Sequence, residues 1–288
     1  MVGRATKTPN LNRLAKEGVL FDNFYAAAPN CSPSRTGLLT GKSPAKVGMY
    51  SYRPPHHPLH LPDKEVTLAE LLKTKGYRTA HIGKWHLGDL TQDAELNHPQ
   101  PHDQGFDHSL GTENNAEPSH LNPKNFILNG NALGLINGYS CQIVAQESID
   151  WMSQRGDDPF FLYAAFHEPH RIVASPPKLV EKYKHLPTKD AEYLANIDHL
   201  DLAIGQILDY LKQNDLIDNT LIIFSSDNGS YRLASNAGLK AVKSYLYDGG
   251  IRVPGIVKWP QIKTNKKIIH SPTGLVDIVP TPVSYTHL

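Results

Sequence analysis

Disulfide bonds cannot organise this chain, because its 288 residues include only two cysteines, Cys31 and Cys141. Charge of one sign is also missing: 29 Lys and Arg against 28 Asp and Glu give a formal charge of +1, so no bulk field draws the chain to nucleic acid. The most apolar stretch, residues 160–166, is far too short to cross a bilayer. Residues 1–7 lack the apolar core of a signal peptide. What remains is a globular protein whose redox compartment stays open.

Helical and strand-like patterns alternate along the chain. Thr8 and Pro9 are typical of an N-cap and a first helical residue, and Gly18 is typical of a helix end. Thr67 and Gly76 repeat this form. The alternation predicts an α/β layered fold with a largely parallel sheet. The expected helices are 8–18, 67–75, 141–154 and 195–211, and the expected strands are 77–82, 160–166 (buried on both faces), 221–224 and 251–257.

A single domain is favoured, because no internal repeat or low-complexity linker divides the chain. Residues 90–137 are rich in Asn, His, Pro and Gly and show little periodicity. A long stretch of this kind inside a compact domain is usually functional or mobile. We therefore expect a long loop there.

Polar side chains follow three of the expected strands directly. Open α/β sheets place ligand sites outside the carboxyl ends of their strands, so these clusters predict one shared crevice. Taken singly, each has a structural explanation: a solvated strand end, a packed histidine pair, and an Asp-Asn-Gly turn. Their joint placement favours the functional interpretation. The clusters are Lys84 and His86, His167 and His170, and Asp227 and Asn228.

A fourth cluster surrounds Cys31. Ser32 as N-cap and Pro33 at the first helical position predict a short helix with Cys31 just before its positive end. Free amides and Arg35 would then form a pocket suited to an anion. The pattern is typical of a thiolate nucleophile with a lowered pKa, whereas most lone cysteines are buried and inert. Cys141, within a predicted helix, takes that second interpretation.

The stretch Cys-Ser-Pro-Ser-Arg at residues 31–35, followed by Thr-Gly-Leu-Leu-Thr-Gly, resembles the signature of the formylglycine-dependent sulfatases. The resemblance runs through nearly the whole chain, and the ordered set of motifs is highly specific. It implies an alkaline-phosphatase-like fold, a mostly parallel central sheet with helices on both faces. The further matching stretches are residues 8–11, 83–88, 168–170 and 226–229, Lys243, and residues 248–254.

The resemblance also implies the chemistry. In this family a maturase oxidises the cysteine of Cys-x-Pro-x-Arg to an aldehyde, formylglycine, whose hydrate is the nucleophile. Cys31 would be that residue, and Arg35 would hold the hydrate. Asp227 and Asn228 match the family's metal-binding pair and, with the modified Cys31, would hold one Ca²⁺ ion.

Further side chains would surround the sulfate and the leaving group. By resemblance these are Lys84, His86, His170 and Lys243, and the sequence does not choose between the last two as the leaving-group acid. Asn115 is a candidate substrate contact. The implied substrate is a sulfated glycan or an aryl sulfate. The implied location of the full-length parent is periplasmic, lysosomal or extracellular.

One family feature is missing from the sequence. Family members open with a buried strand ending in paired aspartates, two further metal ligands, and no Asp-Asp precedes Thr8. We expect residues 1–283 to be a catalytic domain truncated at its start, residues 284–288 a non-native tail, and the C-terminal subdomain to be missing. Such a fragment should bind metal weakly, expose apolar surface on neighbouring strands and be poorly active or inactive alone.

Three other functions stay open at this point. A phosphonate or phosphodiester hydrolase of the same superfamily would need more metal-binding Asp and His than the evident pair of Asp227 and Asn228. A non-catalytic sulfate-binding relic is compatible with the missing strand. A conventional cysteine hydrolase would keep Cys31 as a thiol.

Overall fold

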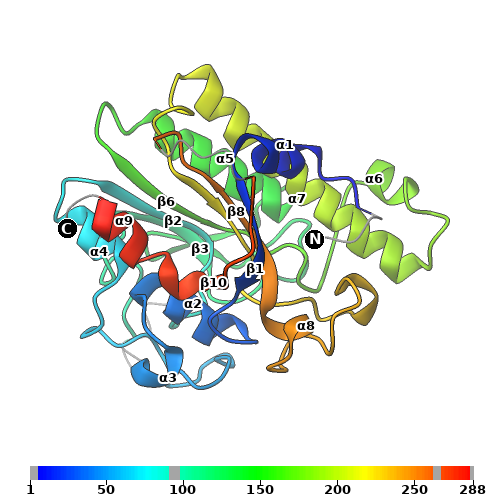
Figure 1. The fold of residues 1–288 in the computed structure, drawn as a ribbon, viewed down its shortest axis with the longest axis horizontal. Coiled ribbons are helices and arrows are strands. Elements are labelled where there is room, and N and C mark those ends of the chain that lie inside the picture. The colour runs from blue at the N-terminus through cyan, green and yellow to red at the C-terminus, as the bar shows by residue number, and fades with distance from the viewer. Residues whose placement is uncertain (1–5, 91–97, 262–266, 286–288) are drawn as a thin grey trace. The chain divides into compact units, whose positions relative to one another are not determined.

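The computed structural model describes residues 6–90, 98–261 and 267–285 (Figure 1). These residues fall into two compact units. The first unit comprises Pro9–Tyr52 and the chain from Leu211 onward, and the second comprises Thr6–Thr8 and Arg53–Tyr210. No helix in the described ranges combines the length and apolar character needed to cross a membrane.

The first unit is built on a mixed sheet whose strand order is β10-β1-β8-β7. β1 pairs in parallel with β10 and β9 and antiparallel with β8, and β8 pairs antiparallel with β7. Phe24 on β1 and Val253 on β8 pack with Ala26 and Leu275 in one core cluster. The strands are β1 (Val19–Tyr25), β7 (Ile222–Phe224), β8 (Arg252–Lys258), β9 (Ile268–Ile269) and β10 (Thr273–Gly274). The helices are α1 (Pro9–Glu17), α2 (Cys31–Thr40), α3 (Pro44–Val47), η1 (Leu233–Ser235), α8 (Asp248–Ile251), η2 (Leu275–Asp277) and α9 (Pro280–Tyr285).

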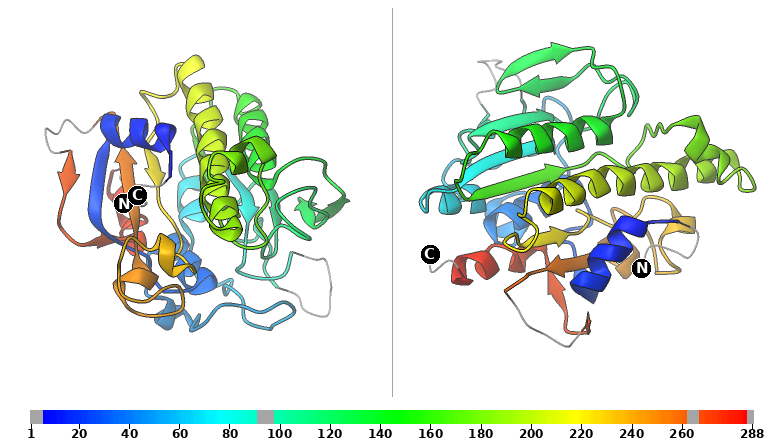
Figure 2. Two further views of the ribbon diagram at one scale, coloured as in Figure 1. Left: turned by 90° about the vertical axis from the view of Figure 1, so that its right-hand side faces the viewer. Right: turned by 90° about the horizontal axis from the view of Figure 1, so that it is seen from above.

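The second unit contains the other sheet, with strand order β5-β4-β3-β2-β6. β2 pairs in parallel with both β3 and β6, whereas β4 joins β3 and β5 in antiparallel fashion. Helix α5 packs against β2 and β6, and α7 lies beside α5 (Figure 2). The strands are β2 (Arg78–Lys84), β3 (His108–Thr112), β4 (Phe126–Leu128), β5 (Asn131–Gly134) and β6 (Phe160–Ala165). The helices are α4 (Leu68–Lys73), α5 (Ser140–Ser153), α6 (Pro177–Glu181) and α7 (Thr188–Gln213), whose last residues belong to the first unit.

Local signals in the sequence predict several of these elements well. α1 begins at Pro9, as expected, and the Gly18 amide closes its last turn on Leu14. Thr67 caps α4 in a capping box with Glu70, since each side chain accepts a hydrogen bond from the other's backbone amide. The α/β class is therefore confirmed, although both sheets are mixed.

Two expectations about the second unit are wrong. Residues 90–137 are not one long loop, because β3, β4 and β5 lie within them. These strands are only three to five residues long, too short to show a period. The strand predicted at 160–166 is not buried on both faces: most of β6 is only half-buried, and among the described residues it pairs with β2 alone.

Candidate active site

Cys31 lies in the first turn of α2, and its side chain is 3% exposed. The N-cap is Asn30, whose extended backbone (φ −135°, ψ 156°) precedes the helix. The Ser34 amide donates to the Asn30 carbonyl at 3.1 Å, so Cys31 and Ser32 are already helical. The expected helix start after Ser32 is therefore wrong, because asparagine is as good an N-cap as serine.

Two side chains from the distal part of the sequence contact the Cys31 sulfur. Lys243 donates from Nζ to Sγ at 3.1 Å. The thiol donates in turn to Oδ1 of Asn228 at 3.4 Å. A cation and an amide oxygen thus meet the one atom that the resemblance implies is converted to an aldehyde.

Arg35 lies one helical turn beyond Cys31, so the two side chains share a face of α2. Its guanidinium binds Asp227, with Nη2 at 2.9 Å and Nε at 3.0 Å from Oδ2. Asp227 and Asn228 therefore reach this face as a pair, one on Arg35 and the other on Cys31. The first unit brings together five predicted site residues: Cys31, Arg35, Asp227, Asn228 and Lys243.

Close backbone approach makes this grouping possible. A Cβ atom on Gly229 would lie 2.0 Å from the Gly249 carbonyl oxygen, so only glycine fits there. The Lys243 amide donates to the Ser230 carbonyl at 2.9 Å, which fixes the segment carrying the lysine. Gly229 and Gly249 are both visible in the sequence. Their close approach is not, because it is a contact between residues that are far apart along the chain.

In the second unit, Lys84 and His86 are each only 2% exposed. Lys84 donates from Nζ to Oδ1 of Asn115 at 3.4 Å, so two predicted site residues meet. His86 contacts the carbonyl oxygen of Arg53 through Nε2 at 2.8 Å. β2 ends at Lys84 and His86 has a left-handed backbone (φ 59°), so strand alternation does not orient these two side chains.

The segment after β6 carries the histidine pair as a turn, with the His170 amide donating to the His167 carbonyl at 2.9 Å. Nδ1 of His170 lies 2.8 Å from the carbonyl oxygen of Arg171. A carbonyl only accepts, so Nδ1 carries the hydrogen and Nε2 is the basic nitrogen of the neutral ring. His167 is buried and contacts Oγ1 of Thr112 at 2.8 Å, so it packs inside the second unit. That all these residues face one crevice with Cys31 stays a prediction.

Sequence reasoning missed a buried charge cluster near His86. Arg53 forms ion pairs with Asp89 and Glu113, and His98 Nδ1 lies 2.9 Å from Asp89 Oδ2. Burial opposes ionisation of Asp89, but the hydrogen bond from Arg53 holds its pKa below the usual value. Burial and the neighbouring Asp89 raise the pKa of Glu113. No periodic pattern joins these residues, so nothing in the sequence points to the cluster.

Because three histidines are buried, we expect the folded protein to lose stability in acid. Burial lowers the pKa of His98, His120 and His199. Below the unfolded pKa of about 6.5, the unfolded chain therefore binds protons that the folded chain excludes. The free energy of unfolding should fall as pH falls from 7.5 to 5.5, by up to about 1.4 kcal/mol per pH unit for each histidine. Urea unfolding of the wild type and of His199→Gln checks this, and an unchanged slope in the variant would contradict it.

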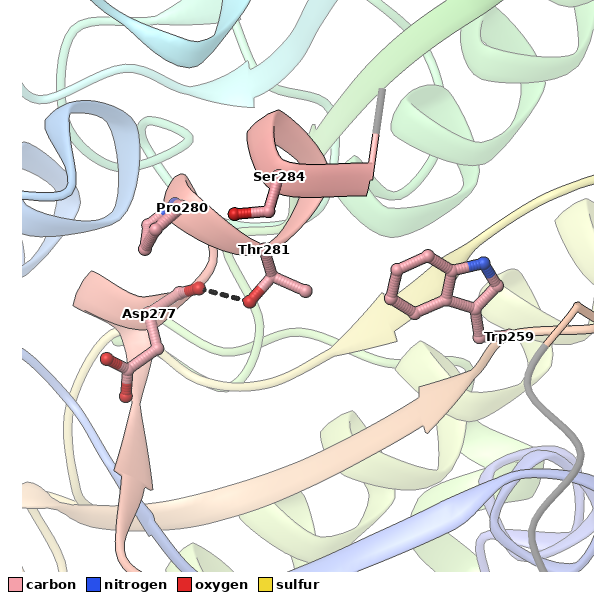
Figure 3. A pocket seen from close by; sticks show the side chains of 5 residues that line it. All are labelled: Trp259, Asp277, Pro280, Thr281 and Ser284. Atoms are coloured by element: carbon pink, nitrogen blue, oxygen red, sulfur yellow. Dashed lines mark hydrogen bonds between the residues drawn. The ribbon is translucent and has the colours of Figure 1, made fainter. Parts of the chain in front are cut away.

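A separate pocket of about 470 Å³ lies in the first unit, around α9 (Figure 3). Thr281 donates from Oγ1 to the Asp277 carbonyl at 2.6 Å on one wall, and Trp259 lies on another side. No predicted site residue lines this pocket. Its lining residues are Trp259, Asp277, Pro280, Thr281 and Ser284.

The sequence model of the family described as Sulfatase matches residues 2–288. The chain belongs to the sulfatase family. It is 33% identical over 313 residues to N-acetylgalactosamine-6-sulfatase of Homo sapiens, covering 98% of this chain and 58% of that protein. It is 31% identical over 310 residues to arylsulfatase A of Homo sapiens, covering 96% of this chain and 59% of that protein. The chain thus spans less than two thirds of these relatives.

A solved structure is also similar to this chain. The crystal structure of Ps i-CgsB in complex with k-i-k-neocarrahexaose has a TM-score of 0.88 and 28% sequence identity, covering 99% of this chain and 68% of that one. The predicted alkaline-phosphatase-like fold is therefore confirmed. Sulfatases of this family generally depend on formylglycine and Ca²⁺.

The residues of the first unit fit a hard cation in kind but not in number. Asp227 and Asn228 offer oxygen, whereas Ca²⁺ takes six to eight oxygen ligands. The Asp227 carboxylate is engaged by Arg35. Across the described ranges, no group of three or more His, Cys, Asp or Glu side chains is arranged to hold a metal ion. These residues do not make a complete Ca²⁺ site.

We expect Ca²⁺ to bind this chain with a Kd of about 10⁻³ M or weaker, in the range of weak calcium modules. The reason is the short ligand set and the competing Arg35 guanidinium. Isothermal titration of the purified chain measures it, with Asp227→Ala as the matched variant. A micromolar Kd that Asp227→Ala abolishes would show that the chain completes the site.

Proposed function

We propose that the protein is a sulfuric ester hydrolase that releases sulfate from a sulfated glycan or an aryl sulfate, using formylglycine made from Cys31. The observation that carries the proposal is the contact of Lys243 and Asn228 with Cys31 Sγ in the first turn of α2. Family membership supports the reaction class. The substrate, the maturase and a periplasmic, lysosomal or extracellular location are part of the proposal.

The contacts that Lys243 and Asn228 make with Cys31 Sγ also suit the converted residue. When formed, the hydrated aldehyde supplies one hydroxyl to attack sulfur and a second to expel sulfate by returning to the aldehyde. Lys243 Nζ is placed to donate to an oxygen there, and Asn228 Oδ1 is placed to accept from one. These two contacts would thus serve hydroxyl groups equally well.

The charges around Cys31 favour the binding of a tetrahedral anion. Lys243 and Arg35 bring two cations, and Asp227 offsets one of them. The first turn of α2 adds the positive end of the helix dipole. Preorganised donors of this kind stabilise the charge that develops as the ester oxygen leaves.

The resemblance assigns Lys84, His86 and His170 to the same reaction, and that assignment stays a prediction. His170 presents Nε2 as its basic nitrogen, because Nδ1 faces the Arg171 carbonyl. A protonated His170 could donate from Nε2 to a departing oxygen. Lys84 is held by Asn115, so a substrate oxygen would replace or share that contact.

The first test is the mass of the Cys31 peptide from chain coexpressed with a formylglycine-generating maturase. Conversion of the thiol to the aldehyde removes roughly 18 mass units. We expect that loss, together with capture of the peptide by a hydrazide probe. An unmodified thiol under these conditions would overturn the mechanism and favour the relic or the cysteine hydrolase.

The chain alone is expected to turn over an aryl sulfate slowly, even after conversion of Cys31. The reason is that the described residues of the first unit do not complete a cation site. Steady-state assay of the matured chain with and without added Ca²⁺ measures this. A turnover number of about 10 s⁻¹, typical of enzymes, would contradict it.

A further inference from the structure

We propose that Arg53 is a positioning residue, which holds His86 so that Nε2 carries a hydrogen and Nδ1 is the basic nitrogen. The role of His86 in catalysis rests on the proposed function. The geometry of the pair does not, because it is a property of the second unit alone. Arg53 lies outside the stretches that carry the resemblance to the family.

The Arg53 side chain bridges two segments of the second unit. It is fully buried and pairs through Nη2 with Asp89 and through Nη1 with Glu113. Asp89 follows β2 and Glu113 follows β3 directly. A planar guanidinium reaches two carboxylates in fixed directions, which the single ammonium of lysine cannot do. The guanidinium of Arg53 is thus held by two carboxylates.

The backbone of Arg53 is constrained as well. The next residue is Pro54, and a residue before proline is restricted to extended conformations. The carbonyl oxygen of Arg53 therefore has little freedom. It lies 2.8 Å from Nε2 of His86.

His86 closes the arrangement into a ring of three residues. Its amide donates to the Glu113 carbonyl at 2.7 Å, while the Glu113 carboxylate binds the Arg53 guanidinium. The Arg53 carbonyl then binds the His86 imidazole. The left-handed backbone of His86 is unfavourable for a side chain of this size, and such conformations persist where surrounding contacts over-determine them. The ring supplies those contacts.

The consequence is a defined tautomer. A carbonyl oxygen can only accept, so Nε2 of His86 is a donor, and in the neutral ring Nδ1 keeps the lone pair. His170 is set in the opposite way, with Nδ1 on a carbonyl. The two histidines assigned to the reaction therefore present different ring nitrogens. Second-sphere contacts of this kind commonly fix which imidazole nitrogen acts.

Nitrogen NMR of the imidazole rings tests the proposal without any activity. In ¹⁵N-labelled chain at a pH where His86 is neutral, we expect a protonated Nε2 and an unprotonated Nδ1. The signals are assigned by their absence in His86→Asn, because asparagine tolerates a left-handed backbone. A wild-type His86 with the hydrogen on Nδ1 would overturn the proposal.

The substitution Arg53→Lys keeps the positive charge but removes the planar guanidinium that pairs with both Asp89 and Glu113. We expect His86 to show a mixture of tautomers in this variant. The matched control is Arg78→Lys on β2, whose guanidinium donates from Nη1 to the carbonyl oxygen of Gln154 at 3.1 Å in an exposed position. If Arg53→Lys does not fold, Glu113→Gln tests the same anchor. An unchanged His86 pattern in the folded variant would overturn the role of Arg53.

In the matured protein, Arg53→Lys should lower kcat about 10- to 100-fold, the range typical of residues that orient a functional side chain through a hydrogen bond, with a much smaller change in KM. A merely structural role would change the amount of folded protein and not the kcat of the folded fraction. If the tautomer is as expected but wild-type protein releases no sulfate, the proposed function fails and the positioning by Arg53 stands. An unchanged kcat beside a disturbed tautomer would overturn its importance for the reaction.

Discussion

Replacing Cys31 with alanine is expected to abolish hydrazide capture and to reduce sulfate release from the matured protein by about 10⁴-fold or more, the range for loss of a nucleophile. The variant has no sulfur to convert, while Lys243 and Arg35 keep the pocket cationic. Alanine is a good helix former, so the first turn of α2 should persist. Capture is measured by mass spectrometry and activity by release of inorganic sulfate.

Cys141 provides the matched control. It lies in α5, is fully buried, and burial raises the pKa of its thiol well above the usual range. Cys141→Ala should therefore leave hydrazide capture at the wild-type level. Capture that survives in Cys31→Ala, or that disappears in Cys141→Ala, would place the modified residue elsewhere. Release of phosphonate in preference to sulfate by the wild type would instead favour the other hydrolase class.

The elements predicted from the sequence are those with local signals. Thr67 and Glu70 define the start of α4 by contacts within one turn, and Pro9 does the same for α1. Strands β3 to β5 are short and sit among polar residues, so their identity comes from pairing and not from periodicity. The start of α2 differs because Asn30 and Ser32 are both acceptable caps.

The residues of the candidate site likewise divide into those with a local signal in the sequence and those without one. Cys31 and Arg35 form a local motif, four residues apart on one helix. Their partners Asn228 and Lys243 lie about two hundred residues further along, and only the family resemblance could join them in advance. Arg53 belongs to none of the stretches that carry the resemblance, and its importance appears from long-range ion pairs with Asp89 and Glu113. Second-sphere residues are found by contacts, because the chemistry of an Arg-Pro-Pro stretch is not distinctive.

Gly83→Ala is expected to lower the free energy of unfolding by about 3 to 5 kcal/mol, at the severe end for a single substitution. An added Cβ would lie 2.0 Å from the Ala165 carbonyl oxygen on β6, the neighbour with which Gly83 is in register. The backbone there also has φ +116°, which side chains rarely adopt. Because Gly83 precedes Lys84, the strand pairing that positions the lysine depends on this missing side chain. Chemical denaturation of both proteins measures the difference.

Gly76→Ala separates the two contributions. Gly76 also has a left-handed backbone, φ +79°, but nothing lies within 4 Å of an added Cβ. Its substitution should therefore cost only the conformational part, about 1 to 2 kcal/mol. The excess cost of Gly83→Ala then reports the contact between β2 and β6. Equal costs at the two positions would mean that β2 does not approach β6 closely enough at Gly83 to exclude a methyl group, and the placement of Lys84 would have to be reconsidered.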